Sequence, residues 1–263
     1  MVEQMTPPAD GQAARILALV LRAGEILLAN GAEVFRVHET MTIMAGSLGL
    51  AGYHDYVLTN GLFASADGTG LAAVRNVPSR SVHLGRVEAV NEISREIAAG
   101  ALTLEEAERR LEEAAALPMP PAPAQVVASA AGSLCFAFLF GGTPAEALIA
   151  AAAGAVEGLF LLGCDRHGVI GMMRRMAGSA VITAVCLLCS TLVPGADPSA
   201  AIIGALMILT PGVAITMGIQ DFLRTDYLSG TIRLIDALLI AGSIAIGTVL
   251  TLALYGAVTG VAV

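Results

Sequence analysis

Five long apolar stretches in the second half of the chain constrain its fold more than any other feature. They run over residues 124–141, 144–163, 174–193, 199–219 and 232–259. A helix needs roughly 20 apolar residues to cross a hydrocarbon core about 30 Å thick, and each stretch is close to that length. The sequence therefore predicts five transmembrane helices, which makes the fold class an α-helical integral membrane protein.

Charged residues concentrate in the part of the chain that precedes these stretches. Residues 1–120 carry 15 of the 22 acidic and 9 of the 14 basic residues. We expect residues 1–116 to form a small cytoplasmic α+β domain. Residues 117–123, "LPMPPAP", hold four prolines and are expected to form a stiff linker. Residues 124–263 then form the five-helix transmembrane domain.

Hydrophobic periodicity predicts the elements of the first domain. Apolar residues recur every three or four positions in its helical segments, whereas the strand-like segments are separated by turn residues such as "DGTG" at 67–70. Thr103 and Glu106 have the spacing of a capping box at the start of the last helix. The expected helices cover 13–29, 32–48, about 87–100 and 103–116, and the expected strands cover 53–59, 61–66 and 71–77.

Arginines predict the orientation of the membrane part. Beyond residue 120 they occur between the second and third stretches and between the fourth and fifth, at Arg166, Arg174, Arg175, Arg224 and Arg233. The positive-inside rule assigns these loops to the cytoplasm. We therefore expect a cytoplasmic N-terminus and an extracytoplasmic C-terminus. The N-terminus lacks a basic segment before its first apolar run, so no secretory signal is expected.

Composition and motifs exclude several classes of function. A net charge of -8 argues against binding nucleic acid. Walker, dinucleotide-binding and calcium-binding patterns are absent from the sequence, and we expect neither a cofactor nor a metal. Cys186 and Cys189 form a CxxC spacing inside an apolar stretch, which we interpret as packing of small residues rather than redox or metal chemistry.

The fourth stretch carries its own interruption, "LTPGVAITMGIQD" at 209–221. Pro211 removes a backbone donor and Gly212 adds flexibility, so this helix should kink or unwind near its centre. Freed carbonyls cannot face lipid, and broken helices form substrate sites in many transporters. A purely structural kink is the alternative interpretation. Thr210 and Thr216 add hydroxyl groups to the same candidate path.

Glu157 is an acidic residue inside the second stretch. A charge at the centre of a membrane helix costs about 2.5 to 3.5 kcal/mol, so Glu157 should face the bundle interior or be protonated. Gly154 and Gly158 flank it in a GxxxG pattern that permits close helix packing. The alternative is that Glu157 forms an ion pair with Arg174 or Arg175.

Polar residues also gather at the ends of the expected spans. Gln220 and Asp221 lie at the expected cytoplasmic face and are candidates for a vestibule that admits a small zwitterion or anion. The alternative is that they are solvated or ion-paired loop residues. On the other face, Glu146 stands in the first turn of the second span, where N-terminal capping explains it. The neighbours of Asp221 are Arg224, Asp226, Arg233 and Asp236.

Three motifs together resemble the threonine/serine exporter family. They are "NGAEVFRVHETMTIMAGSLGL" at 30–50, "VNEISREIAAGALTLEEAERRLEE" at 90–113 and "PGVAITMGIQDFLRTDYLSGTIRLIDALL" at 211–239. The chain departs from the family pattern at Val34 and His38, where threonine and an acidic residue are usual. The motif residues carried over are Gly31, Glu33, Arg36, Pro211, Gly212, Asp221 and Gly230.

The resemblance implies a bacterial inner-membrane protein that works with a partner. The family occurs as long single chains and as two-component systems, and this chain is similar in length and layout to the first component. A small second-half membrane subunit is the expected partner, in an oligomer. Glu33 and Arg36 are three residues apart, which fits a simple intrahelical ion pair or a gating role against the membrane part.

The expected function is export of a small carboxylate-bearing metabolite. Threonine, serine and dicarboxylates such as succinate all fit, and proton coupling through Glu157 or Asp221 is expected. A membrane-tethered enzyme is an alternative, but no nucleophile or metal motif organises its candidate residues. A sensor or scaffold that acts through the cytoplasmic domain is another. The candidate residues for an enzyme are Ser65, Ser79, Ser81, His54 and His83.

Overall fold

The computed structural model describes residues 10–77, 82–169 and 171–260. The chain divides into two compact units. The first unit contains the described residues up to Met119 together with Met217–Ile232. The second contains Pro120–Thr216 and the chain from Arg233 onward. Each unit has its own hydrophobic core.

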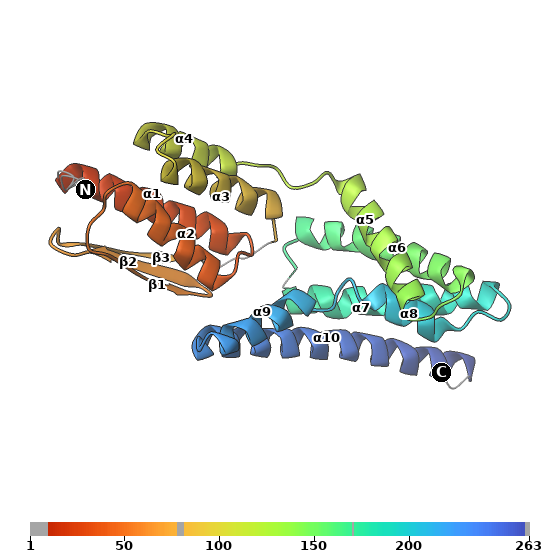
Figure 1. The fold of residues 1–263 in the computed structure, drawn as a ribbon. Helices are drawn as coiled ribbons and strands as arrows, with labels where there is room; N and C mark the ends of the chain where they lie inside the picture. Colours follow the sequence, from red (N-terminus) through yellow and green to blue (C-terminus); the bar gives the residue numbers. More distant parts are fainter. Residues whose placement is uncertain (1–9, 78–81, 170, 261–263) are drawn as a thin grey trace. The chain divides into compact units, whose positions relative to one another are not determined.

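Helices and a small sheet form three layers in the first unit. The sheet is one outer layer, α1 and α2 form the middle layer, and α3 and α4 form the other outer layer (Figure 1). This arrangement confirms the helices and strands expected before residue 117. Their bounds are α1 (Asp10–Ala29), α2 (Val34–Ser47), β1 (Tyr53–Leu58), β2 (Gly61–Ala66), β3 (Leu71–Asn76), α3 (Leu84–Ala98) and α4 (Leu104–Ala115).

The sheet is an antiparallel meander in the order β1-β2-β3. Tyr53 pairs with Ala66 across the first hairpin, and Gly61 pairs with Asn76 across the second. The second hairpin contains the predicted turn, in which Gly68 and Gly70 have φ of 77° and 68°. Residues with a side chain rarely adopt such backbone angles, which is why glycine occupies these positions.

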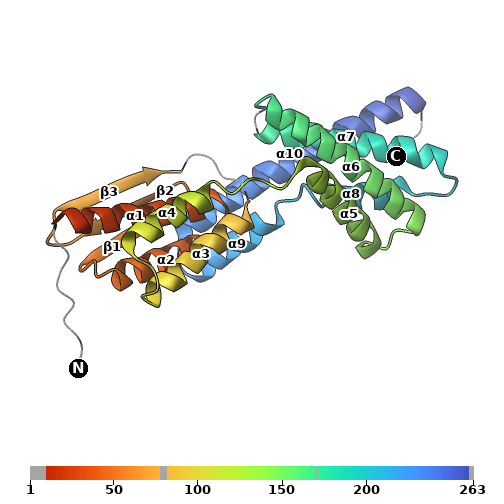
Figure 2. The same ribbon diagram turned by 90° about the horizontal axis from the view of Figure 1, so that it is seen from above.

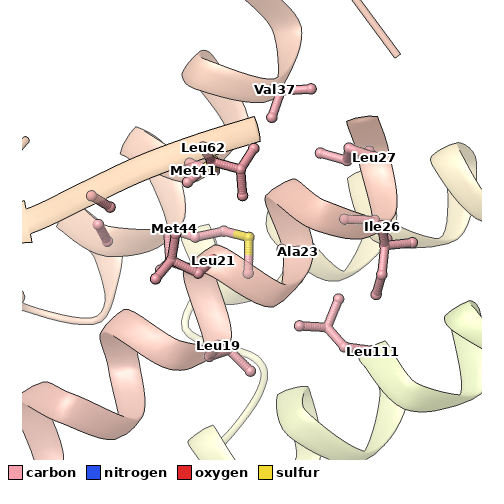
Figure 3. Packing of buried hydrophobic residues seen from close by; sticks show 14 of the residues in the cluster. Leu19, Leu21, Ala23, Ile26, Leu27, Val37, Met41, Met44, Leu62 and Leu111 are labelled. Atoms are coloured by element: carbon pink, nitrogen blue, oxygen red, sulfur yellow. The ribbon is translucent and has the colours of Figure 1, made fainter. Parts of the chain in front are cut away.

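Aliphatic and methionine side chains fill the core between the layers. Leu21 and Leu27 of α1, Met41 of α2, Leu62 of β2 and Leu111 of α4 each expose 1 % or less of their surface (Figure 3). Helix α1 contacts the sheet on one side and α3 and α4 on the other. It is therefore apolar around most of its circumference, as a helix in a middle layer must be.

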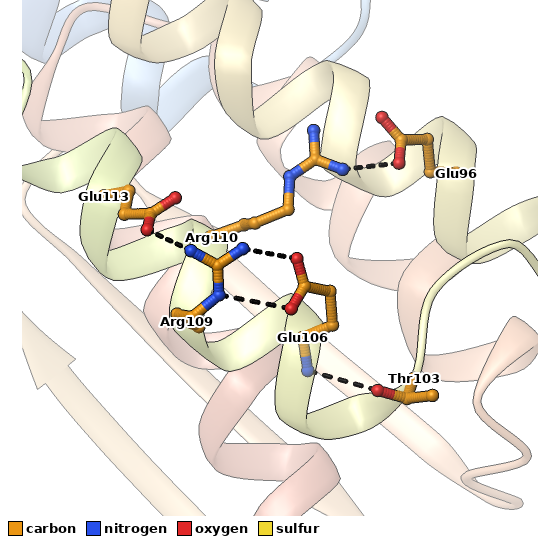
Figure 4. Close-up of polar contacts among 6 residues, drawn as sticks. All are labelled: Glu96, Thr103, Glu106, Arg109, Arg110 and Glu113. Carbon is orange, nitrogen blue, oxygen red and sulfur yellow. Dashed lines mark hydrogen bonds and ion pairs between the residues drawn. The ribbon is translucent and has the colours of Figure 1, made fainter.

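Helix α4 begins with half of the predicted capping box. The hydroxyl of Thr103 accepts a hydrogen bond from the Glu106 amide at 3.2 Å. The Glu106 carboxylate turns instead to Arg109, whose Nε donates to it at 3.1 Å (Figure 4). Arg110 pairs with Glu96 of α3 and so joins the two helices of the outer layer.

The second unit is a helical bundle. Helices α5 and α6 lie side by side in both views, and α7 and α8 pack against α6 (Figure 2). Four helices in the described chain, α5, α6, α7 and α10, are long and apolar enough to cross a membrane. The bounds are α5 (Ala122–Leu139), α6 (Pro144–Arg166), α7 (Gly171–Leu192), α8 (Pro198–Leu206), α9 (Gly212–Leu223) and α10 (Tyr227–Thr259).

The expected fourth span is not one continuous helix. Helix α8 ends at Leu206 and α9 begins at Gly212, so the chain leaves the helical path around Pro211. The predicted interruption is confirmed, and it divides the expected fourth span over 199–219 into two short helices, neither of which is among the four candidate membrane helices of the described chain. Because Pro211 has no N–H and excludes the preceding residue from helical geometry, the two short helices replace one long helix.

Glycines set the spacing between α5 and α6. A Cβ at Gly154 would stand 2.2 Å from the Ser133 hydroxyl and 2.8 Å from the Ser129 carbonyl. A Cβ at Gly158 would stand 3.3 Å from Val126. The predicted close approach at the GxxxG pattern is therefore confirmed, because a side chain at Gly154 would collide with α5 and one at Gly158 would crowd it.

Glu146 caps α6 as predicted. Its carboxylate accepts a hydrogen bond from the Thr143 amide at 2.7 Å, and the Thr143 hydroxyl accepts one from the Glu146 amide at 3.4 Å. The other carboxylate oxygen accepts from the Asp197 amide at 2.9 Å. One side chain thus caps α6 and fixes the segment that leads into α8.

A buried carboxylate links α2 to the sheet. Asp55 exposes 2 % of its side chain, and its Oδ1 lies 2.8 Å from Nδ1 of His38. Burial raises the pKa of the Asp55 carboxyl above its ordinary value, and the charge of His38 lowers it by a smaller amount. The charged form of Asp55 is therefore destabilising in the folded protein.

We predict that Gly154→Val disrupts the packing of α5 on α6. Overpacking against the Ser129 backbone should cost about 1 to 3 kcal/mol or more and lower the melting temperature of the detergent-purified protein. Gly163→Val is the matched control, because a Cβ at Gly163 meets nothing within 4 Å. Equal melting temperatures for the two variants would contradict the packing.

We also predict that Asp55→Asn changes how stability depends on pH. An unfolded aspartate loses its proton near pH 3.9, whereas folded Asp55 keeps it to higher pH. The folded state then binds more protons within this window, so its stability falls as pH rises through it. Asp55→Asn removes that fall, and its unfolding free energy relative to wild type should be higher at pH 7 than at pH 3.

Urea unfolding followed by tyrosine fluorescence measures this difference. The chain has no tryptophan, and two of its four tyrosines, Tyr53 and Tyr56, lie in β1. Asp67→Asn is the control, because 73 % of that side chain is exposed. The same relative stability of Asp55→Asn at both pH values would show that burial does not perturb this carboxyl.

Candidate functional site

Glu157 is buried in the second unit, where it exposes 1 % of its surface. Ser129 of α5 donates a hydrogen bond from its hydroxyl to Oε2 of Glu157 at 3.1 Å. The other oxygen, Oε1, has no hydrogen-bond partner among the residues that the structure describes. It lies 3.7 Å from where a Cβ of Gly178 in α7 would stand. The prediction that Glu157 faces the bundle interior is confirmed.

The glycine pattern of α6 explains this position. Gly154 and Gly158 bring α5 close enough for Ser129 to reach the carboxylate. Ser133, one helical turn from Ser129, is also buried, and its hydroxyl has no partner in the described chain. The α5–α6 contact thus buries Glu157 and Ser133 and half-buries Ser129 in an otherwise apolar interface. Buried polar groups that lack a hydrogen bond are costly.

Arg175 of α7 reaches the interruption between α8 and α9. Its Nη1 donates a hydrogen bond to the Leu209 carbonyl at 3.2 Å. Leu209 is buried and lies outside both helices, so its carbonyl needs a donor from another element. The predicted freed carbonyl therefore exists, and a guanidinium from α7 satisfies it.

The two adjacent arginines have different partners. Arg174 forms an ion pair with Asp165 at the end of α6. Both Arg174 and Arg175 are near enough to Glu157 to interact with its charge. No ion pair joins Glu157 to either of them within the described residues, so the alternative interpretation, a direct pair with Arg174 or Arg175, does not hold. Glu157 is held by a serine hydroxyl and attracted by two cations that are engaged elsewhere.

The other residues of the interruption do not join this cluster. Pro211 is buried, whereas Thr210, Gly212 and Thr216 are exposed in the chain alone. The Thr210 hydroxyl donates to the Leu206 carbonyl at 3.2 Å, and the Thr216 hydroxyl donates to the Gly212 carbonyl at 3.0 Å. Both hydroxyls therefore bond to their own turn of backbone.

Gln220 and Asp221 belong to the first unit, in the C-terminal part of α9. Asp221 exposes 5 % of its surface. The turn after α9 carries Arg224, whose guanidinium carbon lies 3.8 Å from the centre of the Phe35 ring of α2. This geometry is a cation–π contact, which fixes the turn against α2.

The three motif residues of the soluble part share one location. Gly31, Glu33 and Arg36 all line a groove of about 570 Å³ in the first unit. The expected Glu33–Arg36 ion pair is wrong, because Arg36 pairs with Glu39 at 3.2 Å. Glu33 is the N-cap residue of α2 with extended backbone angles, so helical spacing does not apply to it.

Two of the residues considered for an enzyme, His54 and Ser65, are cross-strand partners on β1 and β2. His54 lies 3.3 Å from Asp67 on the exposed sheet, whereas His83 caps α3 by accepting a hydrogen bond from the Arg86 amide. Ser79 and Ser81 lie outside the described residues. No group of three metal-binding side chains occurs in the described part of the chain.

Two features of this site were not predicted from the sequence. Ser129 has a recognisable signal, because Ser129 and Ser133 are four residues apart and form a polar stripe that matches the glycines of α6. The contact between Arg175 and the Leu209 carbonyl has no such signal, because it joins positions 34 residues apart through packing of three helices.

Comparison with known proteins agrees with the motifs. The ThrE family model, described as "Putative threonine/serine exporter", matches residues 18–255. A protein of Mycobacterium tuberculosis named "Probable threonine/serine exporter" is 26 % identical over 244 residues, which are 90 % of this chain and 46 % of the relative. This chain thus spans about half the length of that relative. No solved structure matches it. The chain belongs to the threonine/serine exporter family, whose members are named as transporters and not as enzymes.

Proposed function

We propose that this chain is a subunit of a secondary exporter that moves small carboxylate-bearing metabolites out of the cell. The substrates are hydroxy amino acids of the threonine and serine type, or dicarboxylates such as succinate. The observation that carries the proposal is the hydrogen bond from Arg175 to the Leu209 carbonyl at the interruption between α8 and α9.

Arg175 can exchange this carbonyl for a substrate carboxylate. Hydrogen bonds between two charged partners are roughly twice as strong as neutral ones, and a guanidinium matches a carboxylate with two parallel donors. A substrate carboxylate that takes Arg175 leaves the Leu209 carbonyl without its donor, which favours movement of the broken segment. Binding and rearrangement of α8 and α9 are thereby coupled.

Glu157 is the proposed proton site. It is buried, and its Oε1 has no described partner, so protonation removes a charge without breaking the hydrogen bond to Oε2. Proton binding at Glu157 also removes a negative charge that attracts Arg174 and Arg175. Loading a proton thus removes a competing negative charge from the neighbourhood of Arg175, which makes binding of a substrate anion, and therefore export, depend on pH.

The proposed arrangement in the cell follows the arginine distribution. The N-terminus and the soluble domain lie in the cytoplasm, the chain sits in the inner membrane, and the C-terminus lies outside. The broken pair α8 and α9 together form the fourth of five crossings. Because the chain spans about half of its relative, we propose that a second-half membrane subunit completes the transporter.

We predict that Glu157→Gln abolishes the pH dependence of export. Glutamine keeps the size and the hydrogen bond from Ser129 but cannot exchange a proton, so flux driven by a pH gradient should fall about tenfold or more, equivalent to about 1.4 kcal/mol. The measurement is efflux of labelled threonine or succinate from proteoliposomes that contain both subunits. Asp236→Asn, at an exposed position on α10, is the control. Unchanged flux and pH dependence in Glu157→Gln would remove this coupling assignment.

We predict that Arg175→Lys impairs export more than Arg174→Lys. Lysine keeps the charge but loses the fork that binds a carboxylate with two donors. Arg175→Lys should therefore raise the apparent KM about tenfold, whereas Arg174→Lys changes it less than twofold, because Arg174 pairs with Asp165 outside the proposed path. Equal effects of the two substitutions would show that only charge matters.

A further inference from the structure

The groove in the first unit is lined by acidic, basic and neutral polar side chains. It lies along α2 and α3, which pack against each other, and encloses about 570 Å³. Its walls carry two guanidinium groups, two carboxylates, two hydroxyls and one amide, with apolar side chains beneath them. The polar residues are Glu33, Arg36, Glu39, Thr40, Asn91, Ser94 and Arg95.

Two of these side chains are buried and have open hydrogen-bonding capacity. Thr40 of α2 is 9 % exposed and Ser94 of α3 is 5 % exposed. Both line the groove, and in the described part of the chain neither hydroxyl makes a hydrogen bond with protein. Neither hydroxyl oxygen is among the fully buried polar atoms that lack a partner, so both are open to the groove and available to a ligand.

Charged residues also line the groove, where Glu33 is half-buried and Arg95 is exposed to solvent. Glu33 is the N-cap residue of α2, yet its side chain makes no capping hydrogen bond. Arg95, in the last turn of α3, forms no ion pair with a described residue. Arg36 and Glu39 neutralise each other at 3.2 Å. One open carboxylate and one open guanidinium therefore remain in a single groove.

We propose that this groove binds a small zwitterionic α-amino acid. Arg95 holds the carboxylate, Glu33 holds the ammonium group, and the hydroxyls of Thr40 and Ser94 supply hydrogen bonds to the polar atoms between them. A dicarboxylate is disfavoured in the same pose, because its second carboxylate would meet the Glu33 carboxylate where the ammonium group binds. The site is separate from the Glu157 and Arg175 cluster, which belongs to the other unit.

The groove also has a route by which occupancy affects the membrane part. Phe35 stands between Glu33 and Arg36 in sequence, and its ring holds Arg224 in the turn between α9 and α10 at 3.8 Å. Met217 of α9 lines the groove itself. An amino acid bound here thus regulates the segment that contains the helix interruption. This regulatory part depends on the proposed export function, whereas the binding part does not.

Binding of labelled L-threonine to the purified full-length chain in detergent, by equilibrium dialysis, tests the site. We expect saturable binding that weakens at least tenfold in Arg95→Gln and in Ser94→Ala. Binding should persist in Arg75→Gln, an exposed arginine on β3, and an excess of succinate should not compete. Glu157→Gln is measured beside these variants as the probe for binding in the transport path. Thermal melting of each variant confirms that it is folded.

Three outcomes would overturn the binding site. They are the absence of saturable threonine binding, binding that Arg95→Gln and Ser94→Ala leave unchanged, and competition by succinate as effective as that of threonine. Loss of binding in Glu157→Gln alone would place the amino acid in the transport path, which rejects this site but leaves the proposed function standing. If the groove binds threonine but the chain and its partner export nothing, the binding site stands and the proposed export function is wrong.

The regulatory part has its own test in proteoliposomes. Phe35→Ala removes the ring that holds Arg224 but leaves the polar groove residues in place. We expect this variant to bind threonine as wild type does, while threonine on the cytoplasmic side no longer changes succinate or threonine efflux. An unaltered response in Phe35→Ala would show that the contact with Arg224 does not transmit occupancy.

Discussion

The need to satisfy backbone carbonyls in an apolar bundle governs the second unit. A proline inside an apolar helix removes donors, and lipid offers none in return. The structure meets this need with Arg175, which donates to the Leu209 carbonyl. A cation among apolar helices needs a compensating charge, and the neighbouring Glu157 supplies one. The interruption, the arginine and the buried acid are therefore one physical solution and not three separate oddities.

Glycine makes that solution possible. If α6 carried side chains at Gly154 and Gly158, α5 would stand farther away and Ser129 would not reach Glu157. Gly178 of α7 similarly leaves the space beside Oε1 of Glu157. Small residues thus let three helices surround one carboxylate and exclude lipid from it. In a bundle without a hydrophobic driving force between helices, such close packing is also what holds the helices together.

Local rules predicted much of this protein, and the failures have a common cause. The elements of the first unit, the interruption at Pro211 and the cap by Glu146 follow from periodicity, proline and capping, all of which act within a few residues. The ion pairs considered for Glu33 and Glu157 do not form in the described chain, because spacing in sequence does not choose among partners. Glu33 precedes the first helical residue of α2, so Arg36 pairs with Glu39 one turn later. The partner of Arg175 depends on how α7 packs beside the turn after α8, which no local pattern encodes.

Helix α9 runs from the helix interruption past Met217, which lines the groove. It begins at Gly212, beside the interruption in the second unit, and its residues from Met217 onward belong to the first unit, where Met217 lines the groove. A helix transmits a displacement along its axis because its backbone hydrogen bonds are continuous. Under the proposed function, a shift of the segment near Leu209 when Arg175 changes partner is expected to reach Met217 through the backbone of this helix. The reverse also holds, because a coupling free energy between two sites acts equally in both directions. If an amino acid in the groove favours one position of α9, the position of α9 must change the affinity of the groove.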